Sequence, residues 1–163
     1  MPIVYRRASL SDLDLLADTR VEVLRAANQL GLDADLSDVR ERSRAYYAHS
    51  LKDGTHTALM VLDGGRVIGT GGVSYYRVMP TFHNPSGEKA YIMNMYTAPS
   101  HRRQGIALHT LSLLVEDAYR RGVTCIGLEA TDMGRPLYER FGFVPAGSEM
   151  LLPEEWSDDR GRP

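Results

Sequence analysis

The stretch TAPSHRRQGIALHTL, residues 97–111, stands where a run typical of a strand gives way to a run typical of a helix. Arg102, Arg103, Gly105 and Ala107 all fall at that junction. A helix N-terminus leaves backbone N–H groups without partners and carries the positive end of the helix dipole, so it attracts anions. Gly105 removes a side chain at the point of closest approach, and the arginines add charge-assisted hydrogen bonds. The pattern indicates a phosphate-binding loop, with a solvated arginine pair before a helix as the alternative.

The composition is that of one folded domain over residues 1–163. Hydrophobic residues make up 43% and charged residues 25% of the chain, which is ordinary for a globular protein. The net charge of −2 gives no reason to expect a nucleic-acid or membrane partner. We find no run of about 20 apolar residues and no signal peptide. Because the single Cys125 cannot form an internal disulfide, we expect a cytoplasmic location.

Hydrophobic periodicity and turn residues divide the chain into strands and helices. We expect Ser11 to cap a first helix and Gly54 to end a second one. Asp63-Gly64-Gly65 predicts a hairpin. The predicted order is strand 3–6, helices 11–28 and 35–54, strands 55–63, 66–76 and 89–98, the helix after the opening stretch, strand 123–130, helix 134–142, and one or two strands within 143–152.

Two of these segments carry stronger patterns. The helix after the opening stretch has an apolar stripe and ends near Gly122. Its stripe consists of Ala107, Leu111, Leu114 and Ala118. The near-continuous apolar run VTCIGLEA, residues 123–130, suits a central sheet position covered on both faces. The order as a whole predicts a mixed α/β fold with the sheet between helical layers.

Other site classes lack their patterns. Neither lysine follows a glycine, so no Walker loop is present. The glycines within 64–72 fit a turn and a bulge better than a dinucleotide-binding loop. One cysteine and five scattered histidines give no zinc spacing, so no metal is expected and the histidines are interpreted as surface or loop residues. No G-x-S-x-G motif for a hydrolase occurs.

The run RRQGIA, residues 102–107, resembles the Arg/Gln-x-x-Gly-x-Gly/Ala signature of the GCN5-related N-acetyltransferases (the GNAT superfamily). Downstream, IGLEATDMGRPLYERFGF is similar to the family's next strand and helix, with its recurrent Leu-Tyr-x-x-x-Gly-Phe. The resemblance implies a mixed, mostly antiparallel sheet of six or seven strands flanked by about four helices. It also implies that the fourth and fifth strands splay apart.

The resemblance further implies acetyl-CoA as the acyl donor. Backbone groups of Met95, Tyr96 and Thr97 would bind the pantetheine arm and polarise the thioester carbonyl. Side-chain packing in the core is the alternative for Met95 and Tyr96. The pyrophosphate would lie on Arg102, Arg103, Gln104, Gly105, Ile106 and Ala107. Arg135 would contact the cofactor or be solvated.

By the same resemblance, Tyr138 is the general acid that protonates the departing thiolate, with aromatic packing as the alternative. Many family members have a glutamate base on the fourth strand, where this chain has Asn94. An amide cannot act as a base, so Asn94 would orient an amine or a water, or bond within the sheet. Other carboxylates that could reach the site are Glu22, Glu88, Glu129 and Asp132; a dedicated base is otherwise absent.

The implied function is direct acetyl transfer to the primary amine of a small molecule in a ternary complex. Two alternatives stay open. One is acetylation of protein N-termini or lysines, and the other is a catalytically silent CoA-binding sensor or interaction module. The acidic residues in the region of the first two helices and their loops (Asp33, Asp35, Asp38 and Glu41) suit a cationic amine or form a solvated face. Exposed sheet edges would allow a homodimer.

Overall fold

The computed structural model describes residues 2–154, and the chain divides into two compact units, Met1–Ala130 and Thr131–Pro163. Nine principal elements occur in the described part. These are β1 (Val4–Arg7), α1 (Leu13–Ala27), α2 (Ser37–Asp53), β2 (His56–Asp63), β3 (Arg66–Arg77), β4 (Glu88–Thr97), α3 (Ile106–Arg120), β5 (Ile126–Leu128) and α4 (Arg135–Phe141). Short 3-10 turns at Leu10–Asp12 and Pro99–His101 precede α1 and α3.

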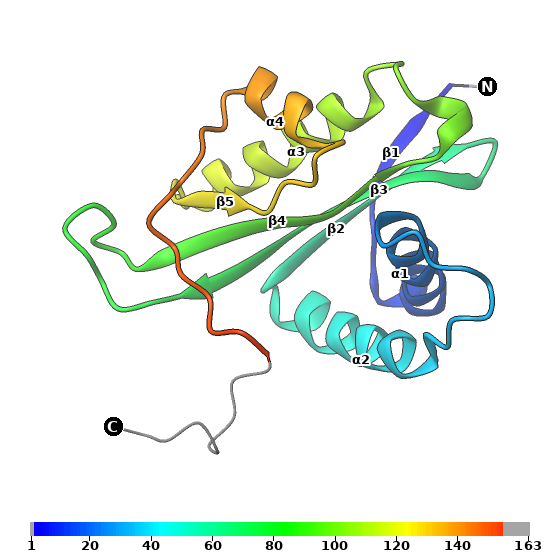
Figure 1. The fold of residues 1–163 in the computed structure, drawn as a ribbon, viewed down its shortest axis with the longest axis horizontal. Coiled ribbons are helices and arrows are strands. Elements are labelled where there is room, and N and C mark those ends of the chain that lie inside the picture. Colours follow the sequence, from blue (N-terminus) through cyan, green and yellow to red (C-terminus); the bar gives the residue numbers. More distant parts are fainter. Residues whose placement is uncertain (1, 155–163) are drawn as a thin grey trace. The chain divides into compact units, whose positions relative to one another are not determined.

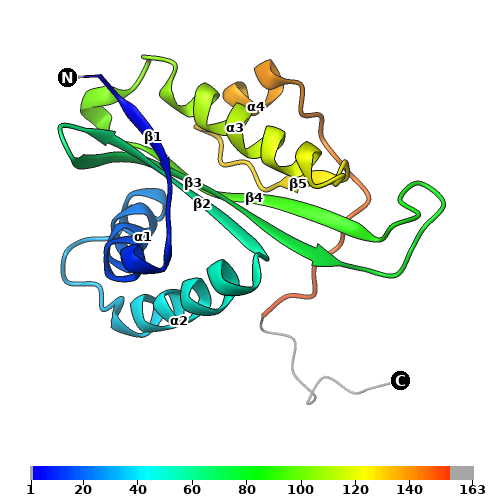
Figure 2. The same ribbon diagram turned by 180° about the vertical axis from the view of Figure 1, so that it is seen from behind.

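The first unit is built on a five-stranded sheet in the order β1-β2-β3-β4-β5. The first four strands pair antiparallel, and β5 runs parallel to β4. The helices α1 and α2 lie on one face of this sheet and α3 lies on the other, as the two opposite views agree (Figures 1 and 2). The predicted mixed, mostly antiparallel sheet between helical layers is therefore confirmed.

The strand β2 links both cores because successive side chains of a strand point to opposite faces. Met60 is fully buried with Leu16 of α1 and Tyr47 of α2. Its neighbour Val61 is fully buried on the other face, where it clusters with Ile106 of α3. The α3 stripe predicted from periodicity is buried as well, since Leu111, Leu114 and Ala118 are fully excluded from solvent.

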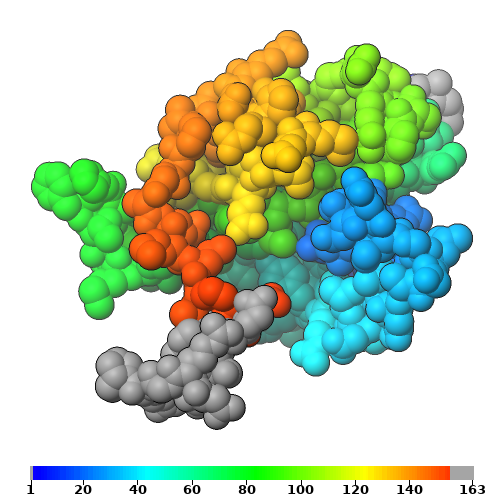
Figure 3. Space-filling view, viewed as in Figure 1, coloured from blue at the N-terminus to red at the C-terminus, as the bar shows by residue number. Residues whose placement is uncertain are grey.

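The turns follow the predicted glycines. Gly64 and Gly65 form the β2–β3 turn with φ of 55° and 81°, and Gly54 ends α2 in the left-handed conformation. The segment 78–87, between β3 and β4, extends away from the rest of the first unit (Figures 1 and 3). The first helical turn begins earlier than predicted: Ser9, not Ser11, precedes it, and the Ser9 N–H donates to Asp12 at 2.8 Å.

The end of the sheet differs from the prediction. The described residues form five strands rather than six or seven, and no strand occurs within 143–152. Pro145 and Gly147 interrupt that segment, and neither residue favours a ladder. β5 has only three residues and lies at the sheet edge. The central position predicted for 123–130 is therefore wrong. β5 pairs with β4 on one edge, and the described sheet has no further strand to pair with its other edge.

The second unit contains α4, which begins with Pro136 in its first turn as predicted and ends at Gly142. A single domain over 1–163 stays a prediction. In the described residues, none of the helices is long and apolar enough to cross a membrane.

Candidate functional site

The N-terminus of α3 presents a run of unpaired backbone donors. Gly105 precedes the helix with φ of 77°, and Arg103 is also left-handed at 61°. From Arg103 to Leu108, no backbone N–H donates to another described residue. A Cβ at Gly105 would meet nothing within 4 Å, so the space beside these donors is open. This geometry suits an anion approaching the backbone.

The side chains around this turn are exposed and partly tethered. Arg102 donates from Nε to the Thr97 carbonyl at 3.2 Å, and Gln104 turns back towards the Ser100 carbonyl at 3.5 Å. Arg103 is exposed and has no partner among the described residues. Of Arg102 and Arg103, Arg103 is therefore the one whose guanidinium has no hydrogen-bond partner within the described residues.

A bulge in β4 changes the direction of its side chains next to this turn. Met93 pairs with Gly72 and Tyr96 with Thr70, so Asn94 and Met95 together face Gly71 alone. Asn94 takes up the extra residue with φ of 58°, a conformation that asparagine tolerates better than most residues. A Cβ at Gly71 would lie 3.0 Å from the Met95 sulfur. The bulge expected within 64–72 is a separate one: Val61 pairs with Gly69 and Leu62 with Val67, so Ile68 is the extra residue of β3 opposite β2.

Beyond the bulge, β4 has no strand partner on its β5 side. β5 pairs only with Ala90, Tyr91 and Ile92, so residues 93–97 have β3 alone as a neighbour within the described sheet. The predicted splay of the fourth and fifth strands is thus present. The buried Thr97 hydroxyl has no hydrogen-bond partner among the described residues. The unpaired edge of β4 leads directly through the Pro99–His101 turn into the α3 N-terminus.

A pocket of about 310 Å³ is lined in part by Asn94. Its walls come from α1, α2 and three strands. They consist of Arg20, Arg42, Ser43, Tyr46, Tyr47, His56, Ser74, Met93 and Asn94. We refer to this as the Asn94 pocket.

The Asn94 side chain joins the two helices that cover the pocket. Its Oδ1 accepts from Arg20 Nη1 at 3.0 Å, and its Nδ2 donates to the Tyr47 hydroxyl at 3.3 Å. Thr70 donates to the Asn94 backbone carbonyl at 2.8 Å. Burial raises the pKa of Tyr47. Asn94 is therefore fixed in one orientation rather than free to swing.

His56 is, with Tyr47, one of the two buried titratable groups of the pocket and is only 4% exposed. Its Nδ1 lies 2.9 Å from the Tyr46 hydroxyl and 3.1 Å from Ser74 Oγ, and its Nε2 has no described partner. Burial, followed by the charges of Arg121 and Arg20, lowers its pKa to about 4. The interpretation of all five histidines as surface or loop residues is thus wrong for His56, which sits at the start of a strand beneath two tyrosines.

The first-unit carboxylates proposed from the sequence do not line the Asn94 pocket. Among its described lining residues the Asn94 pocket has no aspartate or glutamate, so Glu22, Glu88 and Glu129 are not part of its wall. The acidic residues near α2 are exposed, and Asp38 is occupied by Arg42 at 2.9 Å. They form a solvated face. No cluster that could hold a metal ion occurs among residues 2–154.

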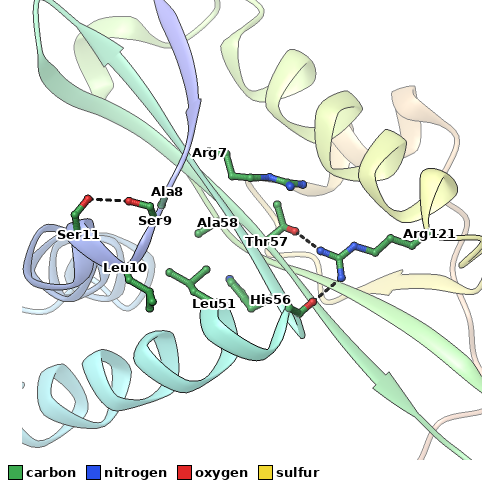
Figure 4. Close-up of a pocket in the computed structure, with 11 residues that line it drawn as sticks. Arg7, Ala8, Ser9, Leu10, Ser11, Leu51, His56, Thr57, Ala58 and Arg121 are labelled. Atoms are coloured by element: carbon green, nitrogen blue, oxygen red, sulfur yellow. Dashed lines mark hydrogen bonds between the residues drawn. The ribbon is translucent and has the colours of Figure 1, made fainter.

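A second pocket, of about 540 Å³, lies between β1 and the start of β2 (Figure 4). Its arginines Arg7 and Arg121 both pair with Asp117 of α3. Asp117 also accepts from Thr57 at 2.8 Å and from Tyr75 at 2.7 Å. Because its charges are already compensated within the protein, this pocket is less suited to a charged ligand than the Asn94 pocket.

In the second unit, Tyr138 of α4 is buried and packs edge-on against Phe143 with 6.1 Å between ring centroids. Burial raises the pKa of its phenol, so the hydroxyl is protonated at neutral pH. Arg135 lies on the same helix and pairs with Glu139 at 3.3 Å.

Sequence reasoning located Asn94 and the α3 turn but missed Arg20, Tyr46, Tyr47 and His56. A local signal for these residues is weak, since tyrosines and an arginine on amphipathic helices are common in packed interfaces. Only the packing of α1 and α2 against β4 brings them to Asn94.

The chain matches the model of the acetyltransferase (GNAT) family over residues 23–143. It is 40% identical over 57 residues to YsnE of Bacillus subtilis, an uncharacterised N-acetyltransferase. That match covers 32% of this chain and 38% of YsnE, so it spans well under half of the curated relative.

Two solved structures are similar over nearly their whole length. One is a predicted acetyltransferase with acetyl-CoA from Clostridium acetobutylicum, with a TM-score of 0.85, 29% identity, and coverage of 93% of this chain and 96% of that one. The other is a GCN5-related N-acetyltransferase from Ralstonia eutropha JMP134, with a TM-score of 0.80, 28% identity, and coverage of 93% and 98%.

Proposed function

The chain belongs to the acetyltransferase (GNAT) family, and we propose that it transfers the acetyl group of acetyl-CoA to the primary amine of a small molecule. The observation that carries the proposal is the run of unpaired N–H groups from Arg103 to Leu108 beside the open space at Gly105. A pyrophosphate suits this turn, because it accepts several hydrogen bonds from the N–H groups and carries the negative charge that a helix N-terminus attracts.

In this proposal acetyl-CoA, the acyl donor, lies along β4 and the α3 turn. Backbone groups of Met95, Tyr96 and Thr97 bind the pantetheine arm. Residues 102–107 bind the pyrophosphate, with Arg102 and Arg103 adding charge. Arg135 adds a further contact once it leaves Glu139.

The transfer is a direct displacement. The neutral amine attacks the acetyl carbonyl carbon, a C–N bond forms, the C–S bond breaks, and Tyr138 donates its proton to the departing thiolate. A phenol is well matched to a thiolate in basicity. Asn94 orients the acceptor amine, and its own fixed hydrogen bonds limit the entropy lost on binding.

The amine's proton goes to solvent in this scheme. The described walls of the Asn94 pocket offer no carboxylate, and His56, with its pKa of about 4, is too weak a base for an ammonium ion. The Arg20 charge near Asn94 favours the neutral amine by repelling the ammonium form. The rate should therefore rise with pH until the bound amine itself titrates.

The direct test is thiol release from acetyl-CoA with a panel of amines, amino acids and peptides. We expect turnover with small amines and a rise in melting temperature with acetyl-CoA alone, equivalent to about 2.7 kcal/mol at a hundredfold excess over Kd. The absence of any thermal shift at millimolar acetyl-CoA would refute donor binding.

A silent CoA-binding module is the second candidate, favoured by the amide at position 94 and the missing carboxylate. Thermal stabilisation by acetyl-CoA without thiol release from any acceptor would support it. Acetylation of protein N-termini or lysines would appear instead as turnover confined to the peptides of the panel. The size of the Asn94 pocket, about 310 Å³, supports the small acceptor.

A homodimer through the free β1 edge and a cytoplasmic location both remain predictions. Light scattering of the purified chain tests the first.

A further inference from the structure

We propose that the acceptor amine carries a carboxylate, as an amino acid does, and that Arg20 is the residue that recognises it. This inference rests on the proposed function, because it assigns the substrate class of the same site. It depends on the state of Arg20, on the charges around it and on the size of the pocket.

Arg20 has hydrogen-bonding capacity to spare. It is half-buried on α1 and donates one N–H, from Nη1, to Asn94 at 3.0 Å. A guanidinium has five N–H donors in a planar fork. No carboxylate within residues 2–154 forms an ion pair with Arg20. A half-buried charge of this kind gains from an anionic partner, and a carboxylate matches the fork with two parallel bonds.

The other arginines of the helical layer differ in this respect. Arg40 pairs with Asp18 at 2.7 Å and Arg44 pairs with Asp14 at 2.8 Å. Arg42, the second arginine of the pocket wall, holds Asp38 at 2.9 Å and is 80% exposed. Arg20 is thus the arginine of this wall whose charge the described protein does not neutralise.

The remaining groups facing the pocket do not supply an opposing charge. His56 is neutral, as its buried environment requires, and Tyr46 and Tyr47 are phenols. The Tyr46 hydroxyl already bonds Ser74 at 2.8 Å and reaches His56. The pocket is therefore positive at its Arg20 end and apolar or neutral along Tyr46, Tyr47 and Met93. Such a site attracts a carboxylate and disfavours an acceptor that is only a cation.

In this proposal, the carboxylate of the acceptor binds to Arg20 and its amine is oriented by Asn94. Arg20 and Asn94 are joined by their hydrogen bond, so a ligand held by both presents its carboxylate and its amine to neighbouring protein groups. An α-amino acid places those two groups on one carbon. A pocket of about 310 Å³ is large enough for a side chain as well.

The test compares glycine, and each common L-amino acid that has a primary amine, with its primary carboxamide in the thiol-release assay at saturating acetyl-CoA. The amide keeps the amine and side chain but loses the negative charge. Its amine is also the less basic, so nucleophile supply alone would favour the amide. We expect kcat/KM for the preferred acid to exceed that for its amide at least tenfold. Equal or better turnover of the amide would overturn the inference.

Variants assign the effect to Arg20. Arg20→Gln should lower kcat/KM for the acid by about 10- to 100-fold and change that for the amide less than threefold. Arg20→Lys should recover part of the loss. Arg25→Gln is the matched control, because Arg25 lies on the same helix and bonds the Gly31 carbonyl outside the pocket. An equal loss for acid and amide in Arg20→Gln would mean that Arg20 is structural.

A binding measurement separates this inference from the proposed function. The N-acetyl amino acids and their N-acetyl carboxamides are titrated calorimetrically into the native protein and Arg20→Gln. Charge-dependent binding lost in the variant supports the carboxylate site even if no amine is turned over. Failure of the native protein to prefer the acid form overturns the site, whether or not acetyl-CoA raises the melting temperature.

Discussion

Asn94 is held by its backbone and its side chain at once. Its left-handed φ of 58° absorbs the extra residue of the β4 bulge, while its amide spans Arg20 and Tyr47. The family resemblance pointed to this position, but its neighbours come from helices that are 47 and 74 residues away in the chain. Sequence identified the residue; tertiary packing gave it its partners.

Tyr138→Phe should lower kcat at least tenfold, because the phenyl ring has no proton for the departing thiolate. The buried ring and its contact with Phe143 remain, so stability and the melting-temperature shift with acetyl-CoA should be nearly unchanged. Steady-state kinetics and thermal shift on the same preparation check this. A variant that loses stability but keeps its kcat would make Tyr138 a packing residue.

His56 should make stability depend on pH between about 4 and about 6.5. The unfolded chain binds a proton on this histidine below about 6.5, whereas the folded chain resists it down to a pKa of about 4. Protons therefore favour the unfolded state in this window. The free energy of unfolding should fall by roughly 1.4 kcal/mol per pH unit as pH decreases.

Urea denaturation from pH 4.5 to 7.5 measures that slope. His56→Gln should flatten it, whereas His49→Gln should not, because the His49 side chain is 81% exposed. Identical slopes in the native protein and His56→Gln would contradict a buried neutral imidazole.

The helix α3 and its first turn were the most predictable part of the molecule. Its start at Gly105, its apolar stripe and its end near Gly122 all follow from local rules about dipoles, periodicity and left-handed glycines. The β5 region was less predictable. An apolar run such as 123–130 suits either a central strand or an edge strand covered by other elements, and only the pairing of distant segments decides between them.

Gly105→Glu should abolish stabilisation by acetyl-CoA, because it places a side chain of five heavy atoms, ending in a carboxylate, beside the proposed pyrophosphate. The backbone strain of a side chain at φ of 77° adds about 1 kcal/mol of instability. Thermal shift across an acetyl-CoA titration measures the effect.

Gly122→Glu is a close control at the other end of the same helix. Gly122 has φ of 75° and equally open surroundings. Gly122→Glu should therefore introduce the same backbone strain, while acetyl-CoA should still raise its melting temperature. Equal loss of the shift in both variants would attribute the effect to helix stability instead of phosphate binding.

Within the first unit, the Asp117 network holds together segments far apart in sequence. Asp117 on α3 contacts Arg7 of β1, Thr57 of β2 and Tyr75 of β3. Burial raises the pKa of Asp117, but hydrogen bonds from Tyr75 and Thr57 and the charges of Arg7 and Arg121 outweigh it and hold the pKa below its usual value. No sequence pattern predicts this network, because none of its residues is part of a motif in its own segment.

Asp117→Asn should lower the free energy of unfolding by about 3 kcal/mol, since it removes the buried negative charge shared by Arg7 and Arg121 and replaces one of the two acceptor oxygens with an NH₂ donor. Asp38→Asn, which removes an exposed pair, should cost under about 1 kcal/mol. Urea denaturation at pH 7 checks both. A change in Asp117→Asn no larger than in the control would show that the network adds little.

The left-handed backbone at Asn94 also limits how the enzyme can evolve. A glutamate there would supply a base only by accepting about 1–2 kcal/mol of backbone strain. Aspartate fits the backbone better, but it would lie against Arg20 and neutralise the charge proposed to select the acceptor. A carboxylate at this one position would therefore supply a base only at the expense of the proposed selection of the acceptor by Arg20.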